Sequence, residues 1–374
     1  MDFTPSRHAD LPGCFNDLGN SYFYYSEYTR NLQDIDDAIF YQQRAVDSTP
    51  SGHADLPKFF NSLGKSYLHC FQQTENLQDI DHAISHFQRA VESDPFGHAD
   101  LPAWLNNLGN SYFHQFKHTR NLQDIDHAIA YQQRSVESTP SGHPNLSDCF
   151  NNLGNSYFHH FEHTGDLQDI DYAISYQQRA VESSHLGNAN LPRWFSNIGK
   201  LYLLRFGCTS DLQNIEQAIS HLQRAVESAP LGCAELPAWL NSLGNSYFHQ
   251  FEHTRNLQDI DHAISYYQRS VESAPLGCAD LPAWLNTLGN SYFHQFEHTR
   301  NLQDIDHAIS YHQRAVESNP SDLQLTSTTL EVHTFAALNI LIISKILIKP
   351  YLIKGELWNP LMLAMLIFQC GSPG

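Results

Sequence analysis

The sequence predicts an all-α fold, a right-handed superhelix of seven stacked helix pairs, on three observations. A segment that opens with Leu-Pro, or once with Leu-Ser, begins at residues 11, 56, 101, 146, 191, 236 and 281, so the spacing is always 45 residues. The copies are also closely similar, since 101–140 and 281–320 agree at 34 of 40 positions. Within each copy, apolar residues recur at the three-to-four spacing of a helix. Units of equal length and sequence are typical of stacked repeats rather than of independent domains.

The first half of each unit predicts one amphipathic helix. In the third copy the apolar stripe is Leu101, Trp104, Leu105, Leu108, Tyr112 and Phe116. Asp100 stands where an N-cap is expected, and Pro102 is tolerated because it falls in the first turn. One side of this helix is therefore expected to be buried.

The second half predicts another helix, beginning after Asn121. Asn121 can cap it, and the carboxylate of Asp124 suits the positive end of a helix. Its stripe is Leu122, Ile125, Ala128, Ile129, Gln132 and Val136. Pro140 and Gly142 end it. Neither helix can bury its stripe alone, so we expect neighbouring units to cover it.

A glycine recurs inside every first helix, and Gly109 is the copy in the third unit. Glycine in a helix costs roughly 1 kcal/mol relative to alanine. Its repetition in all seven copies predicts that the second helix approaches the first one closely at this point.

The expected organisation has three parts. Residues 1–10 match the connector between repeats, 11–322 hold the seven repeats, and 323–374 form an apolar tail without the repeat signature. Three interpretations of the tail stay open: a cap over the last repeat, a gene model that has run past an exon edge, and a membrane anchor. Residues 335–353 have nearly the length of a membrane span, but Lys345 and Lys349 interrupt them.

The repeat resembles the tetratricopeptide repeat (TPR). The resemblance is carried by Leu105, Leu108, Gly109, Tyr112, Ala128, Ser135 and Pro140. Gln132 departs from it, because an aromatic residue is usual there, and the unit is longer than the usual 34 residues. This long form resembles TPR arrays of basidiomycete fungi, many of which end in a caspase-like CHAT protease domain, and TPRs of the kinesin light chain. The resemblance implies a TPR-like α–α superhelix with a concave groove.

Composition limits the function. The formal charge is −19, with 40 acidic residues against 21 Lys and Arg. This excess argues against nucleic acid, whose phosphates need clustered basic residues, and favours a basic or neutral protein partner. Scattered cysteines and no signal peptide indicate a cytoplasmic protein. No P-loop, Gly-rich dinucleotide motif or hydrolase elbow occurs, so we expect neither an enzyme nor a cofactor.

Two sets of polar residues look like metal or acid sites but have simpler interpretations. His114 and His118, with the pairs at 249/253 and 294/298, have the spacing of metal-ligand pairs on a helix. No further ligand completes them, so we expect a solvated helix face and no metal site. Asp124 and Asp126 are two apart on a helix and do not face each other.

Two asparagine columns are the candidate binding site. They lie four residues apart on the first helix, on a face offset from the apolar stripe. The first column is Asn16, Asn61, Asn106, Asn151, Asn241 and Asn286, and the second is Asn20, Asn110, Asn155, Asn245 and Asn290. Phe113, Phe158 and Phe248 lie near the same face. Amides can hold the backbone of an extended peptide. The alternative is that they make hydrogen bonds between repeats.

The sequence thus favours a non-catalytic scaffold that binds an extended peptide in the groove. One alternative is the regulatory TPR portion of a CHAT-type protease that lacks its catalytic domain. A weaker alternative is a membrane-tethered adaptor.

Overall fold

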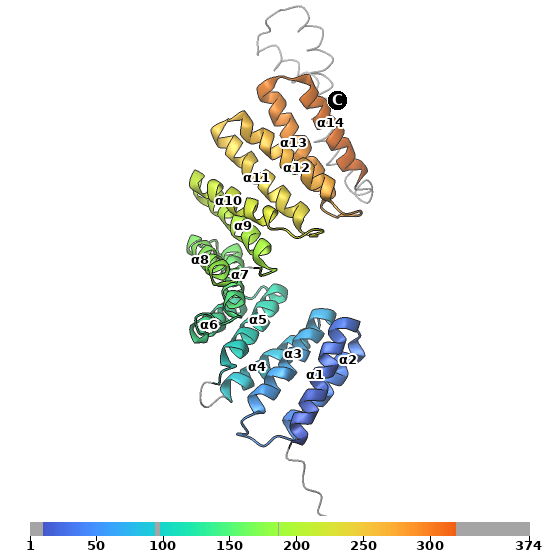
Figure 1. The fold of residues 1–374 in the computed structure, drawn as a ribbon, viewed down its shortest axis with the longest axis vertical. Coiled ribbons are helices and arrows are strands. Elements are labelled where there is room, and N and C mark those ends of the chain that lie inside the picture. Colours follow the sequence, from blue (N-terminus) through green and yellow to red (C-terminus); the bar gives the residue numbers. More distant parts are fainter. Residues whose placement is uncertain (1–9, 94–97, 186, 319–374) are drawn as a thin grey trace, which may run out of the picture. The chain divides into compact units, whose positions relative to one another are not determined.

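The computed structural model describes residues 10–93, 98–185 and 187–318, and all regular structure in these ranges is α-helical. The chain divides into two compact units, residues 1–275 and 276–374. The described part of unit 1 contains α1 to α12, and that of unit 2 contains α13 and α14 (Figure 1). The all-α prediction is confirmed.

Each repeat is one helix pair. The first helices have 19 residues each: α1 (Leu11–Thr29), α3 (Leu56–Thr74), α5 (Leu101–Thr119), α7 (Leu146–Thr164), α9 (Leu191–Thr209), α11 (Leu236–Thr254) and α13 (Leu281–Thr299). The second helices have 16 or 17 residues: α2 (Leu32–Asp47), α4 (Leu77–Glu92), α6 (Leu122–Ser138), α8 (Leu167–Ser183), α10 (Leu212–Glu227), α12 (Leu257–Ser273) and α14 (Leu302–Glu317).

A short turn joins the two helices of a pair. In the third repeat, Arg120 ends α5 in the left-handed conformation with a φ of 57°. The Asn121 side chain then accepts the Gln123 backbone N–H, which confirms the expected N-cap of α6. The Thr119 hydroxyl donates to the buried carboxylate of Asp124 at 2.7 Å. These side chains satisfy backbone and carboxylate groups that the helix ends would leave open.

Two local expectations are wrong. Asp100 occupies the N-cap position of α5, but its side chain accepts no capping bond, because its backbone is near the right-handed helical region rather than extended. Leu122 remains 42% exposed because it is the first residue of α6, and the leucine that begins each of the other second helices is similarly exposed. The remaining stripe of α6 is buried or half-buried.

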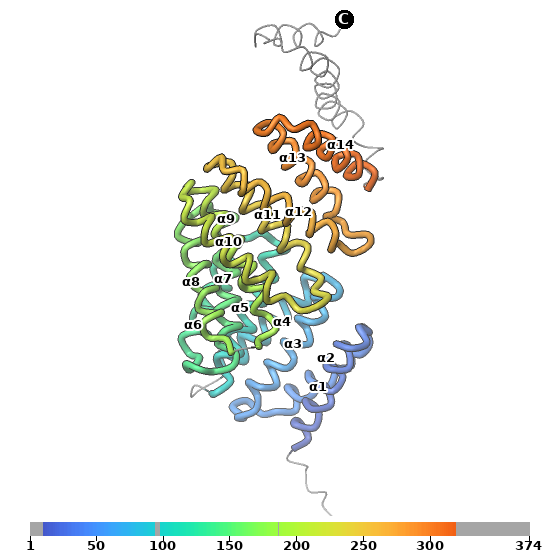
Figure 2. Tube along the Cα trace, turned by 45° about the horizontal axis from the view of Figure 1, so that its top comes forward, coloured from blue at the N-terminus to red at the C-terminus, as the bar shows by residue number. Residues whose placement is uncertain are grey.

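Within unit 1 the pairs stack in chain order (Figures 1 and 2). Each second helix from α2 to α10 packs against its own first helix and against the first helix of the next repeat. First helices of successive repeats also meet directly, at α1–α3, α3–α5, α5–α7 and α9–α11. Among the described residues of unit 1, no two second helices pack in this way. The first helices therefore lie on the inner side of the stack.

The recurring glycine lies where the two helices of a pair touch. A Cβ at Gly109 would stand 2.6 Å from Cγ of Gln132 and 3.0 Å from the Ala128 backbone oxygen. Any side chain there would separate α5 from α6. The close approach expected from the sequence is confirmed.

Candidate functional site

The second asparagine column lies on the first helices, and its amide oxygens are used inside the repeat. The second helix of the same repeat donates to each oxygen in four copies. The bonds are Gln42 to Asn20 at 3.0 Å, Gln132 to Asn110 at 2.9 Å, Gln177 to Asn155 at 2.8 Å and the Tyr267 hydroxyl to Asn245 at 2.7 Å. Among the described residues, the NH₂ groups of these asparagines donate no hydrogen bond, and the side chains are half-buried. Each amide is therefore held with its donor side directed away from the second helix.

A serine of the following repeat fixes the glutamine in turn. Ser66 donates to the Gln42 amide oxygen and Ser156 to that of Gln132, both at 2.7 Å and both buried. For Gln177 of the fourth repeat, the following repeat has Leu201 in place of this serine. The Gln177 amide oxygen is consequently buried without a partner among the described residues.

The two lysines in the second column occur where the second helix has no hydrogen-bond donor for an asparagine. Lys65 and Lys200 replace asparagine in the second and fifth repeats. In these repeats the second-helix residue against the glycine is apolar, Phe87 and Leu222, and has no donor for an amide oxygen. Asparagine thus occurs only where the second helix carries a donor or, as at His312, a ring nitrogen. Ammonium and NH₂ groups alike offer donors, so the column presents donors throughout.

In the first asparagine column Asn16 and Asn61 are buried, and the column connects neighbouring repeats at two positions. Asn107 donates to Asn61 at 2.9 Å, and Asn152 donates to Asn106 at 3.2 Å. Asn16 is 1% exposed, and neither its nitrogen nor its oxygen has a partner among the described residues. Asn16 lacks the inter-repeat bond because the next repeat has Ser62 at the position of Asn107 and Asn152, and the serine side chain is shorter.

The remaining members of the first column have mixed surroundings. Asn151 and Asn241 are half-buried, and their amide oxygens lack a partner among the described residues. In unit 2, Asn286 and Asn290 are exposed, and the Asn286 oxygen lies 3.1 Å from Nδ1 of His312. The first column therefore includes the inter-repeat bonds that the alternative interpretation expects, at Asn61 and Asn106.

The three phenylalanines are half-buried rather than free on the surface. Phe113 and Phe158 pack against apolar clusters of their own repeats. The Phe113 ring also lies 5.1 Å from the His159 ring of the next repeat. Phe248 lies 6.3 Å from the Phe251 ring. Only part of each ring can contact a ligand.

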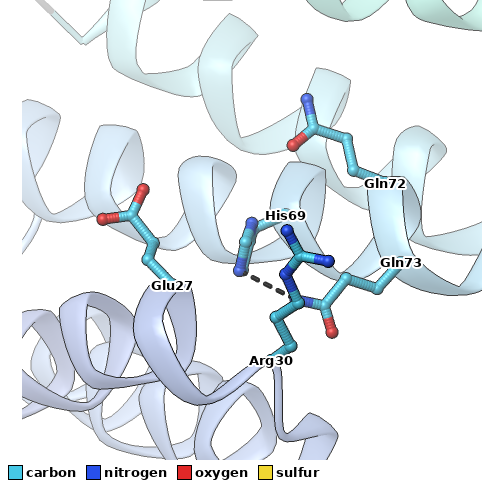
Figure 3. Close-up of a pocket in the computed structure, with 5 residues that line it drawn as sticks. All are labelled: Glu27, Arg30, His69, Gln72 and Gln73. Carbon is cyan, nitrogen blue, oxygen red and sulfur yellow. Dashed lines mark hydrogen bonds between the residues drawn. The ribbon is translucent and has the colours of Figure 1, made fainter. Parts of the chain in front are cut away.

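A polar hollow of about 650 Å³ continues the face of the second column (Figure 3). Its lining comes from the C-terminal halves of α1 and α3 and the turn after α1: Glu27, Arg30, His69, Gln72 and Gln73. Glu27 is seven residues after Asn20 and Gln72 is seven after Lys65, which is about two helical turns. Inside the hollow, Nε2 of Gln73 lies 3.1 Å from Nε2 of His69.

The acidic charge lies mainly on the second helices. Each second helix of unit 1 carries one arginine and at least two carboxylates. The first helices of unit 1 are close to neutral, with the basic residues Lys58, Lys65, Lys117, Arg193, Lys200 and Arg205 against Asp17, Glu27, Asp148, Glu162 and Glu252. The total charge therefore does not describe the first-helix face.

The expected solvated histidine face is wrong at His114. Its ring is half-buried and lies 6.3 Å from the ring of Phe71 in the preceding repeat, and burial lowers its pKa to about 4. His294 is also half-buried, whereas His118, His249, His253 and His298 are exposed as expected. Within the described ranges, no group of three potential ligands is placed to hold a metal ion.

A further polar column was missed at the sequence level. Gln88, Gln133, Gln178 and Gln223 of the second helices donate to the tyrosine hydroxyl of the next first helix, at 2.7, 2.6, 3.1 and 2.9 Å respectively. The acceptors are Tyr112, Tyr157, Tyr202 and Tyr247. Both positions are invariant in all seven copies, and that invariance could have revealed the pairing.

In the described part of the chain, none of the helices combines the length and apolarity that a membrane span requires. The tail at 323–374, with its three interpretations, lies outside the described residues.

This fold and its columns define a helical-repeat solenoid. The comparisons with known proteins agree. A tetratricopeptide-repeat family model matches residues 103–145, and the Sel1 repeat model matches 62–95, 151–185, 197–229, 240–274 and 288–320. The two models together take in six of the seven repeats, and the chain is a tetratricopeptide-repeat protein.

Solved structures share the fold at low sequence identity. The C-terminal part of a TPR repeat-containing protein from Cytophaga hutchinsonii matches with a TM-score of 0.55 and 15% identity, over 79% of this chain and 98% of that one. A signal-transduction ATPase with a tetratricopeptide repeat sensor, from Pyrococcus horikoshii, gives a TM-score of 0.58 and 14% identity over 84% of this chain and 43% of that one. No curated protein matches the sequence. The similarity to fungal CHAT-associated arrays and to the kinesin light chain stays a prediction.

Proposed function

We propose that the chain is a non-catalytic scaffold that binds an extended peptide segment along the inner face of its first helices. Repeats of the TPR and Sel1 classes generally mediate protein–protein interactions, and solenoids made only of such repeats are typically non-catalytic. A cytoplasmic location belongs to this proposal.

The observation that supports the peptide site is the fixed orientation of the second asparagine column. Each oxygen of Asn20, Asn110, Asn155 and Asn245 already accepts a bond from its own repeat, so the group of each amide left without a bond among the described residues is its NH₂ donor. A row of donors matches the carbonyl oxygens of an extended backbone, which recur along a chain whatever its side chains are. Because the asparagines are already held, binding loses little side-chain entropy.

The charge distribution refines the expected partner. Since the first helices of unit 1 are nearly neutral, the site does not require a basic ligand. We infer a peptide that is recognised mainly through its backbone carbonyls. The acidic second helices would act on association at longer range, where total charge matters.

The test replaces Asn20, Asn110, Asn155 and Asn245 together with aspartate. A carboxylate keeps an oxygen for the Gln or Tyr donor, so the internal bond survives, but it has no NH₂ group to donate. The control replaces Gln78, Gln123, Gln168 and Gln258 with glutamate. These four are exposed at the starts of second helices, so the control adds the same charge away from the face.

Peptides are selected from a random display library on the natural chain and then titrated against all three proteins, after circular dichroism has shown equal helicity. We expect the selected peptides to bind the natural chain and the glutamate control, and to lose at least tenfold in affinity for the aspartate variant. Equal affinity for all three would place the binding site elsewhere. Failure to select any peptide would contradict the proposed function.

A further inference from the structure

The first helix of the stack exposes a surface that is buried or half-buried in the later first helices of unit 1. We name this surface the front face of α1. It consists of Leu11, Cys14, Leu18, Ser21 and Tyr25. Their spacing of three and four residues places them on one side of the helix. Leu18 is 42% exposed and Tyr25 59%.

At the position of Leu18, the next five first helices carry Leu63, Leu108, Leu153, Ile198 and Leu243, and each is at most 1% exposed. The preceding second helix covers them. Leu108, for example, packs with Ile80, Ile84 and Phe87, which belong to α4. The front face of α1 is thus a further copy of an interface that unit 1 forms five times, from α2–α3 to α10–α11.

The helix that fits such a face is known from these five contacts. Ala45 and Val46 near the end of α2 pack against Phe59, Phe60 and Leu63. At four of these contacts the invariant glutamine of the second helix donates to the invariant tyrosine of the next first helix, as Gln88 does to Tyr112 at 2.7 Å, whereas Gln43 of α2 donates to Asp47. In α1 that tyrosine is Tyr22, so the acceptor for such a glutamine is present.

The complementary surface exists on α14. Ala45, Ala90, Ala180 and Ala225 are 0% exposed, because the next first helix covers them. Their counterpart Ala315 remains partly exposed, whereas Val316 is half-buried like Val91, Val136, Val181 and Val226. Gln313, the counterpart of Gln88, is exposed. The apolar residues and the donor that the front face of α1 requires are therefore accessible on α14.

We propose that the front face of α1 binds α14 of a second copy of this chain, so that copies associate head to tail. Leu18 takes the place that Leu63 has against α2, with Ala315 and Val316 of the second copy in the roles of Ala45 and Val46. Gln313 of that copy donates to Tyr22. The two surfaces differ, so the contact is heterologous, and one copy can use both surfaces at once.

The test measures self-association of the full chain by sedimentation velocity over a wide concentration range. Leu18→Asp places a charge on the front face, and Ala315→Arg places one on α14. Each variant is expected to weaken association at least about tenfold, since burying a leucine is worth that much. Leu32→Asp is the matched control, because Leu32 is 47% exposed in the same repeat but lies outside the front face, and it should associate as the natural chain does.

Mixing separates this contact from any other kind of association. Leu18→Asp keeps an intact α14 and Ala315→Arg keeps an intact front face, so an equimolar mixture should form heterodimers and no larger species. Gln313→Ala replaces Ala315→Arg if the latter loses helicity. A natural chain that stays monomeric, or association that Leu18→Asp does not change, would overturn the proposal. This test involves no peptide, so its result is independent of the proposed peptide site.

Discussion

A single residue of each second helix differs more between repeats than its neighbours do, the one that lies against the invariant glycine. It is Gln42, Phe87, Gln132, Gln177, Leu222, Tyr267 or His312, in chain order. Because the glycine has no side chain, each of these very different groups can lie directly on the first helix. The same residue decides whether the first helix carries an asparagine or a lysine facing the proposed ligand. One position of the packed interior thus controls one position of the inner face.

Adding a methyl group at this glycine is expected to destabilise unit 1. Gly109→Ala gains roughly 1 kcal/mol of helix propensity. Its Cβ would stand 3.0 Å from the Ala128 backbone oxygen, however, and backbone can move only if α6 shifts. We expect a net loss of about 1–3 kcal/mol, as for other overpacked cores, measured by urea denaturation. Gly207→Ala is the control, because a Cβ there meets nothing within 4 Å, and it should stabilise the protein. A Gly109→Ala protein as stable as that control would refute the explanation.

At the scale of the helix pair, the turn between the two helices is built in the same way throughout the chain. The residue after each first helix is left-handed, and it is Arg30, Glu75, Arg120, Gly165, Ser210, Arg255 or Arg300. Only the fourth repeat uses glycine there. A left-handed conformation costs a residue with a Cβ roughly 1 kcal/mol or more, so six of the turns carry local strain.

Exchanging arginine and glycine at these turns is predicted to change stability in opposite directions in the third and fourth repeats. Arg120→Gly should stabilise the third pair by about 1 kcal/mol, because glycine adopts a φ of 57° without strain. Gly165→Arg should destabilise the fourth pair by a similar amount. Thermal unfolding of both variants, followed by circular dichroism, checks the prediction. Shifts of the same sign would show that the side chains rather than the backbone conformation determine stability here.

Repeats two and five differ from the others as whole elements. Both combine a lysine in the second column, a histidine at the second-helix position that is Tyr131 in the third repeat, and an apolar residue against the glycine. The histidines, His86 and His221, stack on Tyr67 and Tyr202 where other repeats have a tyrosine pair. The Nδ1 atoms of both rings are buried and have no partner among the described residues.

For the chain as a whole, these histidines predict stability that depends on pH. Burial, followed by the nearby Arg89, lowers the pKa of His86 to about 4. Burial, followed by the nearby Arg224, likewise lowers the pKa of His221 to about 4. An unfolded histidine has a pKa near 6.5, so between about pH 6.5 and 4 the unfolded state binds more protons. Lowering the pH from 7 to 5 should therefore destabilise unit 1 by on the order of 1–2 kcal/mol for each buried histidine.

The measurement is denaturation at pH 7 and pH 5. His86→Tyr should reduce the pH dependence, because tyrosine occupies this position at Tyr131 and remains neutral at both values. His53→Tyr serves as the control, since His53 has a half-exposed side chain near Asp55 and lies in a connector. If the two variants keep the same pH dependence as the natural chain, buried histidine is not its cause.

The sequence determined the repeat length, the start of each second helix and most of the buried stripe, because helix periodicity, the N-cap of the second helix and glycine positions act locally. Repetition within one chain also marked the residues that pack, such as Gly109 and Ile125. The structure was needed to show which side of each polar group is used. Asn110 could have been a donor, an acceptor or both, and only the position of Gln132 across the helix pair fixes its oxygen. It likewise showed that His114 is covered by Phe71 of another repeat, since contacts over such separations depend on how the pairs stack.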